Sequence, residues 1–135
     1  MNKRILVIDD HPINLKLACD VMEHEGYIVD RADAADAALA CIARAMPDII
    51  LMDLAMPGMD GLTLTRLLRS RADTREVPVV ALTAFAMKRD EEKALEAGCD
   101  DYVSKPIDTR TLPARLAALL ASRARASRRP STPAA

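Results

Sequence analysis

Five short runs of apolar residues alternate along the chain with segments whose apolar residues recur at helical spacing. Short continuous apolar runs are typical of strands that are buried on both faces of a parallel sheet. The five runs lie at residues 5–8, 27–31, 49–52, 77–82 and 102–103. Their regular exchange with helices predicts an α/β layer fold with right-handed crossovers.

The intervening helical segments carry start and stop signals. Pro12 suits a first helical turn, and Gly26 and Gly98 suit helix ends. We expect Asp33 to cap the second helix and Asp108 to open the last one, which should end near residue 121. At 135 residues, half of them apolar, the chain can close a single core but has no room for a second domain.

Charge and hydropathy exclude several classes of protein. The 19 basic and 20 acidic side chains leave a net charge of −1, which argues against a dedicated nucleic-acid binder. No apolar run approaches the ~20 residues of a membrane span, and the first run is too short for a signal peptide. We therefore expect a soluble, cytoplasmic protein with no membrane partner. The three cysteines are irregularly spaced, which favours small core residues over disulfides or metal ligands.

The C-terminal stretch differs in composition from the rest. Residues 122–135 contain four arginines, no acid and little to bury, so we predict a domain over 1–121 followed by a disordered basic tail. Without these arginines, 15 basic and 20 acidic side chains remain, a net charge of −5. We interpret the tail as a solubilising extension, and an electrostatic docking arm is the alternative.

Polar side chains follow four of the five strands where each strand ends. Asp9 and Asp10 follow the first strand, Asp53 the third, Thr83 the fourth and Lys105 the fifth. The carboxyl ends of parallel strands share one edge, where open α/β sheets bind their ligands. We therefore expect these side chains to converge on one pocket.

The residue types in this pocket indicate phosphoryl chemistry. Three carboxylates close together repel one another and call for a cation, and Mg²⁺ suits a site that combines carboxylates with phosphate oxygens. An aspartate carboxylate can attack a phosphoryl group, while Lys105 and Thr83 would bind its oxygens. The chain has no glycine-rich phosphate loop, so a nucleotide is not the expected substrate.

In their order along the chain, these motifs resemble the receiver domains of two-component response regulators. The matching motifs are Asp9-Asp10, Leu51-Met52-Asp53, Met56-Pro57-Gly58-Met59-Asp60-Gly61, Ala81-Leu82-Thr83-Ala84 and Lys105-Pro106. The resemblance covers residues 3–121 and is greatest to DivK-type single-domain receivers and to receivers attached to hybrid histidine kinases. It implies a flavodoxin-like (βα)5 fold, with a five-stranded parallel sheet in the order 2-1-3-4-5 and helices on both faces.

The resemblance also assigns roles to individual residues. Asp53 would accept a phosphoryl group from a histidine kinase or a histidine phosphotransfer protein. Mg²⁺ would be bound directly by Asp10, mostly through water by Asp9, and by Asp53 and the backbone carbonyl of Ala55. Lys105 would pair with the phosphoryl group and precede a cis peptide bond to Pro106.

Thr83 and Tyr102 would form the switch pair of such a receiver. On phosphorylation, Thr83 would move toward the phosphoryl oxygens and the ring of Tyr102 would turn inward, reshaping the surface of helix four, strand five and helix five. That surface would bind a downstream protein effector, because the chain ends about one linker after helix five. The protein would catalyse only its own phosphorylation and dephosphorylation and would otherwise not be an enzyme.

Some positions are less standard, and other functions stay open. Ala55 and Phe85 stand where the family often has polar residues that influence the attacking water, so we predict slow autodephosphorylation. His11 stands where asparagine is common in the family. It sits beside the acidic pair and could touch the site without being its ligand, and it has no assigned role. An aspartate-nucleophile phosphatase is an alternative, although Asp53-Leu54-Ala55 lacks that class's second acid. A receiver module derived from a hybrid histidine kinase is another.

Overall fold

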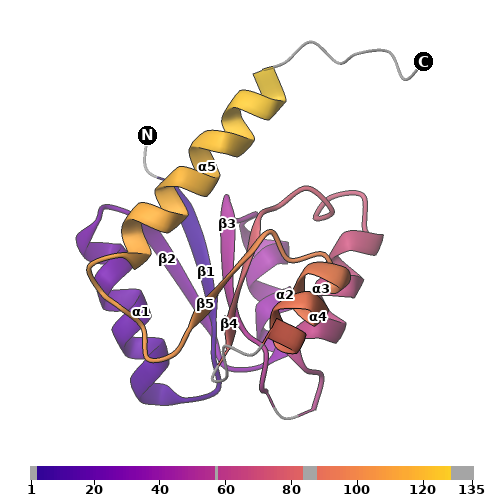
Figure 1. The fold of residues 1–135 in the computed structure, drawn as a ribbon, viewed down its shortest axis with the longest axis horizontal. Helices are drawn as coiled ribbons and strands as arrows, with labels where there is room; N and C mark the ends of the chain where they lie inside the picture. The colour runs from indigo at the N-terminus through magenta and orange to yellow at the C-terminus, as the bar shows by residue number, and fades with distance from the viewer. Residues whose placement is uncertain (1–2, 57, 84–87, 129–135) are drawn as a thin grey trace.

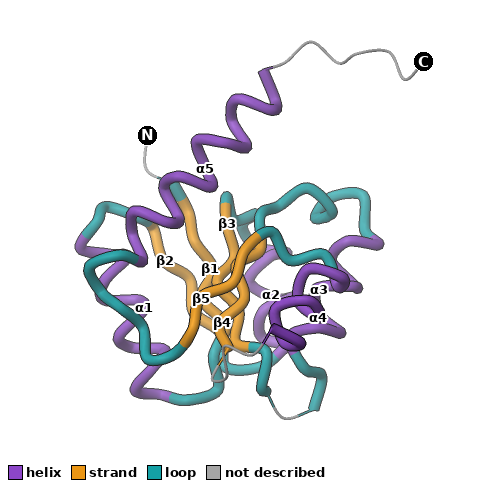
Figure 2. The backbone as a smooth tube through the Cα atoms, viewed as in Figure 1, coloured by secondary structure: helices purple, strands orange, loops and turns teal. Residues whose placement is uncertain are grey.

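The protein folds around one five-stranded parallel sheet. The structure, a computed structural model, describes residues 3–56, 58–83 and 88–128. The strand order is β2-β1-β3-β4-β5, and every neighbouring pair is parallel. Figure 2 shows the strands at the centre of the molecule with helices on either side. The strands are β1 (Arg4–Ile8), β2 (Ile28–Ala32), β3 (Ile49–Asp53), β4 (Val79–Thr83) and β5 (Asp101–Ser104). The α/β class is the one that the alternation of apolar runs and helices predicted, and the strand order is the one that the resemblance implied.

Helices cover both faces of the sheet (Figure 1). The helices are α1 (Pro12–His24), α2 (Ala35–Arg44), α3 (Gly61–Ser70), α4 (Lys88–Ala97) and α5 (Leu112–Arg128). One buried cluster joins the sheet to α1 and α5, and a second joins it to α2, α3 and α4. Successive side chains of a strand point to opposite faces, so each central strand contributes to both clusters.

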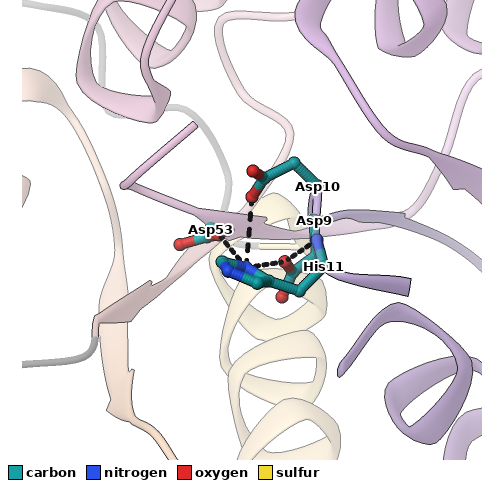
Figure 3. Close-up of side chains that lie close together, drawn as sticks. All are labelled: Asp9, Asp10, His11 and Asp53. Atoms are coloured by element: carbon teal, nitrogen blue, oxygen red, sulfur yellow. Dashed lines mark hydrogen bonds and ion pairs between the residues drawn. The ribbon is translucent and has the colours of Figure 1, made fainter. Parts of the chain in front are cut away.

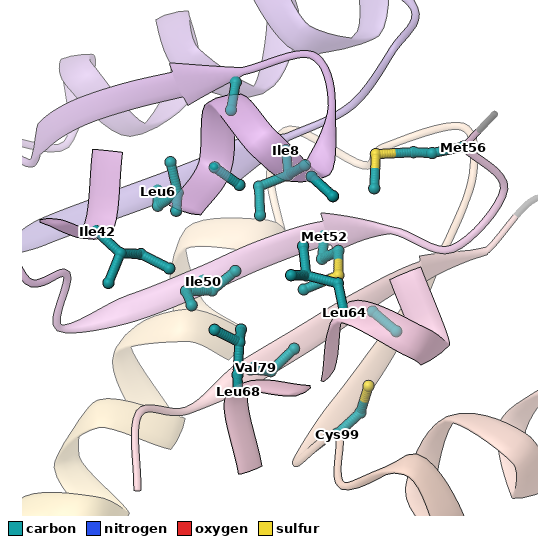
Figure 4. Close-up of a cluster of buried hydrophobic side chains, with 14 of the residues drawn as sticks. Leu6, Ile8, Ile42, Ile50, Met52, Met56, Leu64, Leu68, Val79 and Cys99 are labelled. Atoms are coloured by element: carbon teal, nitrogen blue, oxygen red, sulfur yellow. The ribbon is translucent and has the colours of Figure 1, made fainter. Parts of the chain in front are cut away.

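The three central strands are the most deeply buried part of the chain. In β3, Ile49 and Leu51 pack toward α1 and α5, while Ile50 and Met52 pack toward α2, α3 and α4 (Figure 4). All five residues of β3 are buried, and so are all five of β4. Burial on both faces explains why these strands have continuous apolar sequences. The sheet is therefore a rigid platform for the loops at its ends.

Capping residues predicted the starts of α2 and α5, and the prediction for α2 differs from the structure. The prediction that Asp33 caps α2 is wrong, because the N-cap is Ala34 and it makes no side-chain cap bond. Instead, the carboxylate of Asp36 in the first turn accepts the N–H of Ala37. Asp108 does open the turn before α5, since its carbonyl accepts the N–H of Leu112.

The last helix continues past residue 121 as far as Arg128 and extends beyond the sheet (Figure 1). The part of the predicted disordered tail at 122–128 is therefore helical, which is consistent with the high helix propensity of alanine and arginine. Residues 129–135 lie outside the described residues, so the division into a domain and a tail stays a prediction.

The structure bears on two further predictions from composition. The three cysteines are free thiols and are buried in the core, as predicted. Within the described ranges, no helix is long and apolar enough to cross a membrane.

Candidate functional site

The predicted site residues lie at the carboxyl edge of the sheet, where backbone hydrogen bonds continue past the strand ends. The N–H of Asp9 donates to the carbonyl of Ala32 (3.1 Å), and that of Lys105 donates to the carbonyl of Thr83 (2.8 Å). These bonds extend the backbone hydrogen bonding of the sheet to Asp9 and Lys105, which follow β1 and β5. Asp53 is the last residue of β3.

Strand alternation places three of these side chains on one side of the sheet. Ile49 and Leu51 belong to the cluster that faces α1 and α5, and Asp53 continues that series. Asp9 continues the same alternation after β1, and Lys105 does so after β5. The sheet geometry therefore turns residues from three distant segments toward one point.

Four polar side chains gather there: Asp9, Asp10, His11 and Asp53 (Figure 3). Each residue offers one atom that could bind a metal ion, and these four atoms all lie within 4.8 Å of one another. Asp9 and Asp53 are 0% and 1% exposed, whereas Asp10 is partly exposed at the rim. The structure thus brings together the three carboxylates that the sequence predicted, and it adds a histidine.

Lys105 is the cation that faces this cluster. Its Nζ lies 3.1 Å from Asp53 Oδ2 and 3.4 Å from Asp9 Oδ2, and its side chain is 14% exposed. The peptide bond between Lys105 and Pro106 is cis. Among the described residues, one ammonium group thus faces three carboxylates, which favours a further cation in the pocket.

One oxygen of each buried carboxylate is held by the backbone. The N–H of His11 donates to Asp9 Oδ1 (2.9 Å), and the N–H of Ala55 donates to Asp53 Oδ1 (3.0 Å). Burial raises the pKa of Asp9, while the bond from the N–H of His11 lowers it and the nearby charge of Asp53 raises it further. These bonds orient both carboxylates and leave their second oxygens toward the pocket.

The second oxygens fit a cation. Asp9 Oδ2, Asp10 Oδ1 and Asp53 Oδ2 are buried atoms that accept no hydrogen bond from any described residue. Lys105 and His11 lie near them at ion-pair distances but without hydrogen-bond geometry. Buried carboxylate oxygens are costly unless paired, and oxygen donors of this kind are what Mg²⁺ prefers. The donor set therefore fits a divalent cation.

Thr83 and Tyr102 lie on β4 and β5, close to this edge. The strands pair Ala81 with Tyr102 and Thr83 with Ser104, so both side chains belong to the face that α3 and α4 cover. The hydroxyl of Tyr102 hydrogen-bonds to the Glu91 side chain of α4, which raises the pKa of the phenol. Tyr102 therefore connects β5 to α4 in this structure.

The loop after β3 packs tightly against Asp53. A Cβ added at Gly61 would lie 2.6 Å from the backbone oxygen of Asp53 and 2.8 Å from Leu54 Cα, so α3 must begin with glycine. Asp60 caps α3 by accepting the N–H of Thr63, and this bond lowers the pKa of Asp60. The turn motif identified in the sequence thus brings the start of α3 against the end of β3.

Four further positions stand out in the sequence near the site: Ala55, Pro57, Phe85 and His11. The backbone N–H of Ala55 contacts Asp53, and its side chain is exposed. Pro57 and Phe85 lie outside the described residues. The position of His11 beside the acidic pair predicts that it can touch the site without being its ligand. Its Nδ1 lies 3.3–3.9 Å from oxygens of all three carboxylates.

Comparison with known proteins agrees with this geometry. A family model described as the response regulator receiver domain matches residues 5–117. This chain belongs to the receiver domain family of response regulators. The receiver domain is 41% identical over 107 residues to the polar-differentiation response regulator DivK of Brucella ovis, covering 79% of this chain and 87% of that protein.

Solved structures share the fold of this receiver domain. A putative response regulator from Chloroflexus aurantiacus matches with a TM-score of 0.86 and 31% identity, over 90% of this chain and 99% of that one. The receiver domain of the sensor histidine kinase PA1611 from Pseudomonas aeruginosa matches with a TM-score of 0.82 and 33% identity, over 90% and 99%. That structure has a magnesium ion coordinated in its active-site cleft.

Proposed function

We propose that Asp53 is the phosphoryl acceptor of this receiver domain and that phosphohistidine is the donor. The observation that carries the proposal is the state of the Asp53 carboxylate. Its Oδ1 is fixed by the N–H of Ala55, and its Oδ2 accepts no hydrogen bond from the described residues and lies 3.1 Å from the Nζ of Lys105. This is an oriented nucleophile next to a cation that can receive phosphoryl oxygens.

The transfer is a displacement at phosphorus. A carboxylate oxygen of Asp53 forms a bond to phosphorus while the bond between phosphorus and the donor imidazole nitrogen breaks. The imidazole nitrogen keeps the electron pair and takes up a proton from solvent. Lys105 pairs with the phosphoryl oxygens, and the Thr83 hydroxyl binds one of them. The product is an aspartyl phosphate, which water later hydrolyses.

Mg²⁺ is the cofactor we assign to the acidic cluster. Asp10, Asp53 and the backbone carbonyl of Ala55 would hold the ion directly, and Asp9 would act mostly through water. When bound, the ion neutralises the negative charge that the carboxylates and the phosphoryl group bring together. The buried oxygens without hydrogen bonds support this assignment, and so does the magnesium ion in the related receiver of PA1611.

Phosphorylation would act through a change in protein binding. Thr83 moves toward the phosphoryl group, and Tyr102 exchanges its bond to Glu91 for a buried position, which reshapes the surface of α4, β5 and α5. A histidine kinase or a histidine phosphotransfer protein supplies the phosphoryl group. A protein effector in the cytoplasm binds the reshaped surface. Ala55 offers only a methyl group where a phosphatase of this chemistry needs an acid, so we do not propose turnover of external phosphoesters.

The test is the intact mass of the protein after incubation with Mg²⁺ and acetyl phosphate, a small phosphoryl donor. We expect one phosphoryl adduct in the wild type and none in Asp53→Asn. The matched control is Asp20→Asn, which replaces an exposed carboxylate on α1 that pairs with Lys16 and should keep the adduct. An adduct of equal yield in Asp53→Asn would overturn the assignment of the acceptor.

A further inference from the structure

His11 places a nitrogen donor in a pocket that otherwise offers only oxygen. Its Nδ1 lies 3.3 Å from Asp10 Oδ1, 3.4 Å from Asp9 Oδ1 and 3.9 Å from Asp53 Oδ2 (Figure 3). Two atoms that each bind one ion at about 2.1 Å lie about 3.0–4.2 Å apart, depending on the angle at the ion. The spacing therefore allows His11 and the carboxylates to share an ion.

The backbone of His11 is fixed while its ring keeps some freedom. The N–H of His11 donates to Asp9 Oδ1, its carbonyl accepts the N–H of Leu15, and Pro12 follows as the first residue of α1. The side chain is 61% exposed, so the ring can adjust by a few tenths of an ångström without disturbing the core. The ring therefore stays at the mouth of the pocket and can adapt to an ion.

The buried carboxylates of the pocket give independent support for a bound cation. Asp9 and Asp53 are fully or almost fully buried, yet an oxygen of each accepts no hydrogen bond from the described residues. The Nδ1 of His11 lies 3.9 Å from one of these oxygens, Asp53 Oδ2, and 3.3 Å from Asp10 Oδ1, a third buried oxygen without such a bond. The acidic residues and the histidine thus form one donor set rather than a surface accumulation of charge.

The chemistry of this donor set differs from that of an all-oxygen site. Mg²⁺ prefers carboxylate, carbonyl and water oxygens, whereas imidazole suits later transition ions, whose affinity for nitrogen sites rises from Mn²⁺ through Co²⁺ to Ni²⁺. We infer that His11 is a metal-selectivity residue that shifts the preference of this site from Mg²⁺ toward transition ions such as Co²⁺ and Ni²⁺. The inference rests on the acidic metal site of the proposed function but not on phosphoryl transfer.

The test compares binding of Mg²⁺ and Co²⁺ to the full chain by isothermal titration calorimetry at about pH 8, where an ordinary imidazole is neutral. The variants are His11→Asn, which removes the nitrogen donor, and His24→Asn, which changes the exposed histidine at the end of α1. Loss of outer partners of metal ligands already weakens binding about 10–100-fold, so loss of a ligand should weaken Co²⁺ binding at least tenfold.

The expected pattern is specific to a ligand. His11→Asn should bind Co²⁺ at least about tenfold more weakly and Mg²⁺ within about twofold of the wild type, and His24→Asn should match the wild type for both ions. The visible absorption of bound Co²⁺ should also change in His11→Asn, because a nitrogen ligand is lost. Equal Co²⁺ affinity and equal spectra in the wild type and His11→Asn would overturn the inference.

Two other outcomes would also overturn it and can be told apart. Equal weakening of Mg²⁺ and Co²⁺ in His11→Asn would show that His11 shapes the pocket without selecting the ion. Absence of binding of either ion to the wild type would remove the acidic metal site itself, and the proposed function with it.

Discussion

Replacement of Arg69 by alanine should lower the free energy of unfolding by about 3 kcal/mol. Arg69 lies in the last turn of α3, and its guanidinium group joins three segments. It donates to the carbonyl of Val77 before β4 (2.6 Å) and to the carbonyl of Gly98 after α4 (2.9 Å). It also pairs with Asp100 Oδ2 (2.8 Å), which in turn accepts the N–H of Val79.

The magnitude follows from burial and from the number of bonds. Hydrogen bonds to a charged group contribute about 1.5–3 kcal/mol each. Where water can reach the oxygen that accepts the bond, water replaces the arginine in the variant, and less free energy of unfolding is lost. The side chains of Arg69 and Asp100 are 18% and 20% exposed, so this pair is intermediate between a surface pair and a buried pair. Loss of a surface pair costs about 0–1 kcal/mol, and breaking a buried pair costs about 3–5 kcal/mol. Three good bonds at this depth give about 3 kcal/mol.

The assay is urea unfolding followed by far-ultraviolet circular dichroism, because the chain has no tryptophan. Arg71→Ala is the matched control: it removes the same residue type two positions later, where the pair with Asp73 is exposed, and should cost about 0.5 kcal/mol or less. Arg69→Lys keeps the charge but not the planar fork and should fall between the two. An Arg69→Ala protein as stable as Arg71→Ala would refute the reasoning.

Three more predictions concern the loop after β3. Asp60→Ala should lower the free energy of unfolding by about 1 kcal/mol near neutral pH. Because the cap bond from Thr63 lowers the pKa of Asp60, this loss is complete above about pH 4 and shrinks as the pH falls further. Equal losses measured by urea unfolding at about pH 7 and about pH 3 would contradict this. Gly61→Ala should destabilise the fold and slow phosphorylation, since its methyl group would displace the backbone of Asp53; unchanged urea midpoints and adduct rates would show that the loop tolerates a side chain. The phosphorylated wild type should lose its phosphoryl group over minutes or longer, because the methyl group of Ala55 cannot orient water, and loss within seconds by intact mass would argue against this.

The sequence was sufficient to predict the sheet and the residues at its edge. Continuous apolar strands are typical of strands that are buried on both faces of a sheet. Four of the five strand ends were also marked by a polar residue such as Asp53 or Lys105. Local signals were weaker at helix ends. Asp33 had the right residue type for a cap, but Asp36 supplies the carboxylate instead.

Interactions between distant segments could not be predicted from the sequence. Nothing in the local pattern distinguishes Arg69 from Arg71, yet one joins three segments and the other pairs at the surface. The distance between His11 and Asp53 likewise depends on how β1 and β3 are placed side by side. At the end of the chain, the lack of apolar residues predicts disorder, whereas the helix propensity of alanine and arginine favours a helix, and α5 runs to Arg128.

The central claim is that Asp53 carries the phosphoryl group, and locating the group on the chain tests it most directly. After phosphorylation with Mg²⁺ and acetyl phosphate, borohydride reduces an aspartyl phosphate to homoserine and leaves free carboxylates unchanged. Peptide mass spectrometry of the digested protein should then find homoserine at position 53 alone. Homoserine at the position of Asp9 or Asp10, or at no position in protein that carries an adduct by intact mass, would contradict the account.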